Sequence, residues 1–120
     1  MNDETPVIDD NVIGELRDSV GGDDGFVSEL AATYLAEGPQ HIQALQDAVA
    51  RGDVAAAVRP AHTLKSSSAS LGAMRLSEIS RGIEYAAREG RSDGLSDAVA
   101  QAQAAWELTV AAMKERGLAG

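Results

Sequence analysis

Apolar residues recur at intervals of three and four along nearly the whole chain, and short glycine-containing turns interrupt this pattern at four points. Such a period belongs to α-helices that bury one face. The turns contain Gly21-Gly22, Gly52, Gly72 and the segment 90–94. Connections this short make successive helices antiparallel neighbours. The sequence therefore predicts an all-α fold, an antiparallel up-down-up-down four-helix bundle with a short extra N-terminal helix.

Each expected helix has an apolar stripe of its own and a polar residue at its start. The expected ranges are about 9–20, 23–51, 54–70, 75–89 and 95–116. In the longest of these helices the residues expected to face inward are Phe26, Leu30, Tyr34, Ile42, Leu45 and Val49.

Two prolines fall inside these expected helices. Proline lacks the N–H that would bond to the carbonyl four residues earlier, and its ring crowds that carbonyl. Apolar periodicity resumes in register after Pro39, so we expect a kink there within one helix. Pro60 bends its helix or restarts it, and we expect the bend. A restart would place His62 in a first turn, near the positive end of the helix dipole.

The chain of 120 residues is long enough for one domain. Residues 1–8 are expected to form a flexible tail, and residues 9–117 a single domain. The acidic start is unlike a signal peptide, and no apolar run approaches the ~20 residues of a membrane span. Without cysteine there is no disulfide and no thiolate metal ligand. We expect a cytoplasmic, monomeric protein with no membrane segment.

The charge of the chain is unevenly distributed. The net charge of −9 argues against nucleic-acid binding, because phosphates would be repelled. Residues 51–91 nevertheless hold seven of the ten basic residues and four of the nineteen acidic ones, a local balance of +3. This positive segment is either a chance cluster on solvated helix faces or a field that favours a phosphoryl group and an acidic partner.

Residues 61–73, Ala-His-Thr-Leu-Lys-Ser-Ser-Ser-Ala-Ser-Leu-Gly-Ala, have two unlike faces as a helix. The inward stripe consists of Ala61, Leu64, Ser68 and Leu71. His62 lies on the other side, with Lys65 three and Ser66 four residues further on. An exposed imidazole beside an ammonium suits a histidine that carries a phosphoryl group and is reached by another protein. A buried structural histidine is the alternative.

Neutral imidazole is a nucleophile, and the solvent-facing ring nitrogen, expected to be Nε2, would take the phosphoryl group. An acceptor for the proton on the other nitrogen would fix the tautomer. The ammonium of Lys65 can form a charge-assisted hydrogen bond to a phosphoryl oxygen, of roughly 1.5–3 kcal/mol. Phosphoryl transfer needs mainly positioning and neutralisation of oxygen charge. The alternative for Lys65 is an ordinary solvated lysine.

The stretch Ala61-His62-Thr63-Leu64-Lys65, followed by small residues and Leu71-Gly72-Ala73, resembles the active-site helix of the histidine phosphotransfer (HPt) domains of bacterial phosphorelays. The resemblance covers nearly the whole chain. It implies that His62 accepts a phosphoryl group from a receiver-domain aspartate and that the group is then transferred to another response regulator. The implied partners are response-regulator receiver domains and a hybrid or sensor histidine kinase. The resemblance implies a phosphocarrier, with no kinase site of its own.

The resemblance also points to further site residues. HPt domains commonly have Gln or Glu 22 residues after the histidine, a position that is Glu84 here, where a carboxylate can orient the ring. The alternative is a surface Glu84 paired with Arg88 at i,i+4. Ser66 departs from the family pattern, which usually has Gly there, so its hydroxyl either hinders close docking or donates to the phosphoryl group. The residues expected to contribute to partner binding are Arg59, Ala69 and Ser70.

Other kinds of site are not supported by the sequence. The Glu-x-x-His pairs of a carboxylate-bridged metal bundle and the glycine-rich loops that bind nucleotides are missing, so we expect no metal and no cofactor. A serine nucleophile at Ser66 with His62 as its base lacks an oxyanion motif. The remaining alternative is a helical adapter that binds a signalling partner through the same surface without phosphoryl transfer.

Overall fold

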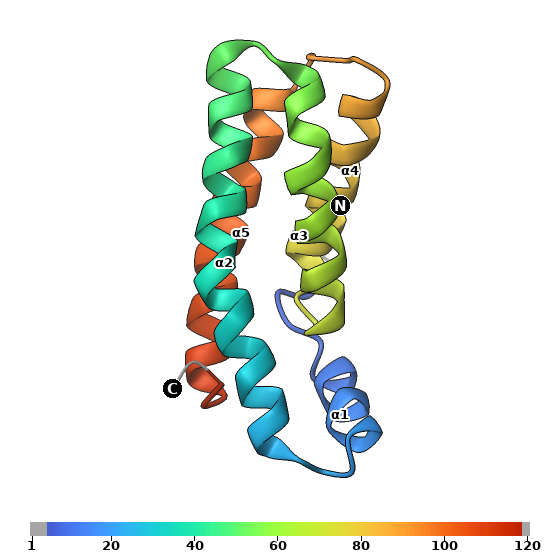
Figure 1. The fold of residues 1–120 in the computed structure, drawn as a ribbon, viewed down its shortest axis with the longest axis vertical. Coiled ribbons are helices and arrows are strands. Elements are labelled where there is room, and N and C mark those ends of the chain that lie inside the picture. Colours follow the sequence, from blue (N-terminus) through green and yellow to red (C-terminus); the bar gives the residue numbers. More distant parts are fainter. Residues whose placement is uncertain (1–4, 119–120) are drawn as a thin grey trace.

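The structure is a computed structural model that describes residues 5–118, and within this range it contains helices and turns but no strand (Figure 1). The helices are α1 (Asp10–Ser19), α2 (Asp24–Arg51), α3 (Val58–Ser70), α4 (Met74–Arg88) and α5 (Leu95–Glu115). A short 3₁₀ helix, η2 (Val54–Ala57), directly precedes α3. The predicted all-α class is confirmed.

Helices α2 to α5 form an antiparallel bundle in which the chain runs up, down, up and down (Figure 1). Each of them packs against the next in sequence, and α5 packs back against α2, so the four helices enclose one core. The short helix α1 lies at one end of the bundle, next to the start of α2 (Figure 1). No helix in residues 5–118 is both long enough and apolar enough to cross a bilayer.

Aspartates define the starts of the first helices. The side chain of Asp9 accepts a hydrogen bond from the backbone N–H of Asn11 at 3.0 Å, and Asp23 accepts one from Phe26 at 3.1 Å. Each bond satisfies a backbone donor that has no partner within its helix. α2 then continues through Pro39 as one helix, as predicted.

Two of the residues predicted to face inward from α2 do not. Phe26 is 42% exposed and Leu30 is 37% exposed, whereas Tyr34 is buried as predicted. A step of four residues turns an α-helix about 40° beyond a full revolution, so a stripe spaced by fours drifts around the helix. Val27 and Ala31 occupy the core positions in this half of α2, and Phe26 and Leu30 are left at the surface.

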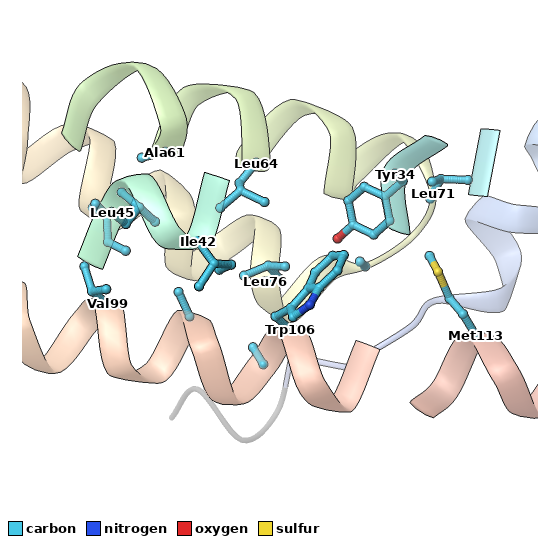
Figure 2. Packing of buried hydrophobic residues seen from close by; sticks show 14 of the residues in the cluster. Tyr34, Ile42, Leu45, Ala61, Leu64, Leu71, Leu76, Val99, Trp106 and Met113 are labelled. Carbon is cyan, nitrogen blue, oxygen red and sulfur yellow. The ribbon is translucent and has the colours of Figure 1, made fainter. Parts of the chain in front are cut away.

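Side chains of α2, α3 and α5 contact one another in the core around Trp106 of α5 (Figure 2). The ring of Tyr34 from α2 meets the indole edge-on, with centroids 5.2 Å apart and planes at 63°. The Tyr34 hydroxyl lies 2.7 Å from the Oγ of Ser68 in α3, which gives both buried oxygens a partner. Burial raises the pKa of Tyr34 to about 12. Gly38 completes the group, because the indole lies against its Cα.

Pro60 does not bend an α-helix, so that prediction is wrong. The chain forms the 3₁₀ helix η2 and changes to α-helix at Val58, which makes Pro60 the third residue of α3. The first turn of a helix needs no N–H donor at this position, so proline is tolerated there. His62 is consequently the fifth residue of α3.

Residues 5–8, which belong to the segment expected to be a flexible tail, make contacts with the rest of the bundle. Ile8 is buried, and the carbonyls of Thr5 and Pro6 accept hydrogen bonds from Arg75. The amide of Asp9 donates to the carbonyl of Gly72 at 2.8 Å. Residues 1–4 of the predicted tail lie outside the described residues. At the other end Leu118 is buried, one residue past the predicted boundary of 117.

Position 72 requires glycine for two reasons. Its φ of +78° lies in the left-handed region, which side chains disfavour. A Cβ there would also lie 2.7 Å from the carbonyl oxygen of Asp9. The turn between α3 and α4 is therefore shaped to receive the start of α1.

The contact between Gly38 and Trp106 predicts a large effect of one methyl group. A Cβ on Gly38 would fall 2.1 Å from the indole, and both groups are buried. We expect Gly38→Ala to lower the free energy of unfolding by about 1–3 kcal/mol, because the packed indole must move. Urea unfolding followed by circular dichroism measures this change.

Gly82→Ala is the matched control. Gly82 also lies in a helix interior, but it is exposed and no atom lies within 4 Å of a Cβ there. Alanine should therefore stabilise the protein by about 0.5–1 kcal/mol through helix propensity. Equal effects of the two substitutions would contradict the role given to the Gly38 contact.

Candidate functional site

The site lies where α3 and α4 pack side by side, and small residues allow these two helices to approach closely. The buried small residues on the facing sides are Ala57, Ala61 and Ser68 before and in α3, and Ala73, Ser77 and Ser80 before and in α4. At the same interface α4 carries a carboxylate, Glu84, which is only 5% exposed. The close packing places this carboxylate beneath the outer surface of α3.

Three side chains share the carboxylate of Glu84. Its Oε2 lies 2.9 Å from Nδ1 of His62 and accepts two hydrogen bonds from Arg88, from Nε at 2.9 Å and from the terminal nitrogen at 2.7 Å. Its Oε1 lies 2.7 Å from Nζ of Lys65. Both oxygens are therefore engaged, as a nearly buried charge requires.

The cations around Glu84 keep it ionised. The hydrogen bond from Lys65 has the largest effect on its pKa, and the bonds from Arg88 and His62 act in the same direction. Burial alone would raise the pKa, but these partners outweigh it and lower the pKa of Glu84 to about 2. The group is therefore a carboxylate at neutral pH.

This carboxylate determines how the ring of His62 is held. The imidazole is 54% exposed, and its Nδ1 points to Glu84. Since an ionised carboxylate can only accept, the neutral ring carries its proton on Nδ1. The other nitrogen, Nε2, keeps its lone pair and is the one available to an incoming group.

The structure thus brings together His62, Lys65 and Glu84 from the residues singled out in the sequence. Arg59, Ser66 and Ser70 are exposed on α3, and Ala69 is half-buried. The hydroxyl of Ser70 donates to the carbonyl of Ser66 at 3.0 Å, one turn earlier. Within residues 5–118 none of these four residues has a side-chain hydrogen bond to His62 or Glu84, so none of them holds the ring in place.

Arg88 was not recognised in the sequence as part of the site. Its spacing from Glu84 predicts only an ion pair at the surface, yet its guanidinium binds the same oxygen that accepts the bond from His62. The i,i+4 spacing was a visible signal for the Glu84–Arg88 pair. What the spacing does not reveal is that Glu84 faces α3.

The sequence matches the family described as Hpt domain over residues 29–116. The chain therefore belongs to the Hpt domain family, whose role is that of a phosphocarrier in phosphorelays and not that of a kinase.

A solved structure shares the fold. The crystal structure of histidine-containing phosphotransfer protein B (HptB) from Pseudomonas aeruginosa PAO1 superposes with a TM-score of 0.84 at 22% sequence identity. The match covers 94% of this chain and 96% of that one. A search of the curated proteins found no match.

The depressed pKa of Glu84 predicts a pH dependence of stability. An acid whose pKa falls from 4.5 to about 2 on folding stabilises the protein fully above pH 4.5 and progressively less as the pH falls toward 2. Glu84→Gln removes this titration. We therefore expect the stability difference between the native protein and the variant to be largest near pH 6 and to shrink steadily toward pH 2.5, measured by urea unfolding at each pH.

Glu37→Gln serves as the control, because Glu37 is exposed and has no ion pair within residues 5–118. Its effect on stability should change little over the same pH range. A constant difference for Glu84→Gln from pH 6 to pH 2.5 would show that its ion pairs do not stabilise the fold.

Proposed function

We propose that His62 is the phosphoacceptor of a phosphorelay intermediate. It receives a phosphoryl group from the aspartate of one receiver domain and passes it to the aspartate of another response regulator. The observation that carries this proposal is the half-exposed imidazole whose Nδ1 is bound to the nearly buried Glu84 at 2.9 Å. This geometry leaves Nε2 free for attack.

In the proposed transfer the lone pair of Nε2 forms a bond to phosphorus while the bond from phosphorus to the aspartyl oxygen breaks. The aspartate leaves as a carboxylate. The ring gains positive charge as the new bond forms, and Glu84 stabilises that charge through the Nδ1–H it accepts. Transfer to the next aspartate reverses these steps, with that carboxylate attacking phosphorus and Nε2 leaving.

Lys65 and Arg88 supply positive charge for the phosphoryl oxygens. Both are bound to Glu84, and both are less buried than it is, so they can reach a group attached to His62. Three equatorial oxygens share the charge in the transition state, and neutralising that charge is the main help a protein can give. Ser66 lies one turn from His62, where its hydroxyl can donate to one of these oxygens.

The proposed docking surface surrounds His62 on the outer side of α3 and extends to α2. Its residues on α3 are Arg59, Ser66, Ala69 and Ser70, which are small or flexible and leave the ring accessible. Phe26 and Leu30 are exposed in the first part of α2, the helix that packs beside α3. They give the surface a small apolar patch, as in short-lived complexes with a polar rim.

The phosphoacceptor role predicts the behaviour of one substitution. Because the ring of His62 is 54% exposed, and because Lys65 and Arg88 still bind Glu84 without it, His62→Gln should leave the unfolding curve almost unchanged. The variant should take up no phosphate from a phosphorylated receiver, whereas the native protein gains an acid-labile, base-stable label. His41→Gln, which alters the other histidine of the chain, is the control and should be labelled normally. Normal labelling of His62→Gln would contradict the assignment of His62 as the phosphoacceptor, whereas absence of any label on the native protein would favour the adapter role.

The docking surface predicts a change in binding without a change in chemistry. Replacing Phe26 and Leu30 together by alanine should raise the receiver concentration needed for half-maximal transfer by about 30-fold, since two exposed apolar contacts of on the order of 1 kcal/mol each are lost. The rate at saturating receiver should be unchanged. Leu108→Ala is the matched control, because Leu108 is 48% exposed but lies on α5. Equal effects of both variants would place the docking surface elsewhere.

A further inference from the structure

The side of α4 that faces α3 carries three polar residues in one row. Ser77, Ser80 and Glu84 are spaced by three and four residues, so they lie along one face of the helix. All three are buried. Ser77 and Glu84 make hydrogen bonds to α3, whereas the hydroxyl of Ser80 has no partner among the described residues.

Ser77 is bonded to the backbone of α3 at the level of the site. Its Oγ donates to the carbonyl oxygen of Lys65 at 2.9 Å. The amide of Ala69 is the regular helical partner of this carbonyl, so the serine adds a second bond to a group that is already satisfied. The bond therefore contributes to the relative position of two helices and not to the satisfaction of a backbone acceptor.

Helix α4 binds Lys65 at both its backbone carbonyl and its side-chain ammonium. The carbonyl of Lys65 accepts from Ser77, and its Nζ lies 2.7 Å from Oε1 of Glu84. Ser77 and Glu84 are seven residues apart, about 10 Å along the helix axis. A hydrogen bond tolerates only a few tenths of an ångström, so a slip of α4 along α3 would break the Ser77 bond and move Glu84 away from Nδ1 of His62 together.

We propose that Ser77 is a positioning residue for the phosphoacceptor: its bond to the Lys65 carbonyl fixes α4 against α3 in the register at which Glu84 binds Nδ1 of His62. Ser77 itself touches neither the ring nor any transferred group. The proposal rests on the proposed function for its effect on transfer, but its effect on the ring exists without any phosphoryl chemistry.

The first measurement is the tautomer of His62 in Ser77→Ala, read from the ¹⁵N shifts of the ring at pH 8. In the native protein the shifts should show protonated Nδ1 and unprotonated Nε2, since Glu84 accepts from Nδ1. In Ser77→Ala the two shifts should move toward each other, because a displaced carboxylate no longer selects one tautomer. Ser77→Thr keeps the hydroxyl and should restore the native shifts.

Ser80→Ala is the matched control. It removes a serine hydroxyl from the same face of α4, one turn away, at a residue with no exposed surface and no hydrogen bond among residues 5–118. The ring shifts and the transfer rate should both stay native. Comparable changes in Ser80→Ala would show that any disturbance of this interface has the same effect, and would overturn the specific role of Ser77.

The second measurement is the rate of transfer from a phosphorylated receiver. We expect Ser77→Ala to lower it about five- to twentyfold, as misplacement of a supporting group does. In a Glu84→Gln background the same substitution should add little, because Ser77 acts through Glu84. Additive losses, or native ring shifts in Ser77→Ala, overturn the inference. Absence of transfer in the native protein would instead contradict the proposed function and leave the tautomer experiment valid.

Discussion

The structure of the site depends on one ionised carboxylate held between two helices. A charge as little exposed as that of Glu84 costs several kcal/mol to bury unless donors surround it. Here the donors come from both helices, His62 and Lys65 from α3 and Arg88 from its own α4. One of the bonds that compensate for burying the carboxylate is therefore also the bond that orients the imidazole. Stability and chemistry share these bonds, which is why a residue two turns away along α4 can matter to the ring.

The helices were predictable because the information that specifies them is local. An apolar period, an aspartate at a helix start and a glycine turn are read within a few residues, and they located all five α-helices. Details that depend on neighbouring helices were not predictable. Phe26 and Leu30 fit an inward stripe on an isolated helix, yet Val27 and Ala31 occupy the core. Likewise, the spacing of apolar residues does not show that residues 5–8 pack against the turn at Gly72.

The same distinction applies to the site. His62 and Lys65 lie on one helix three residues apart, so their proximity follows from helical geometry. Glu84 is on another helix, and only the resemblance to a family pattern selected it from the other acids of that segment. The fit of α4 against α3 depends on small buried residues such as Ala61 and Ser80, and no spacing rule gives the register of two packed helices. Arg88 and Ser77 were missed for that reason.

The packing around Trp106 has a practical consequence. Trp106 is the single tryptophan of the chain, it is 7% exposed, and it lies against Gly38 and Tyr34 of α2. Through the Tyr34 hydroxyl it is connected to Ser68, on the helix that carries His62. The tryptophan fluorescence of the protein therefore originates at one buried position where three helices meet. Its emission wavelength reports whether those helices are packed around the indole.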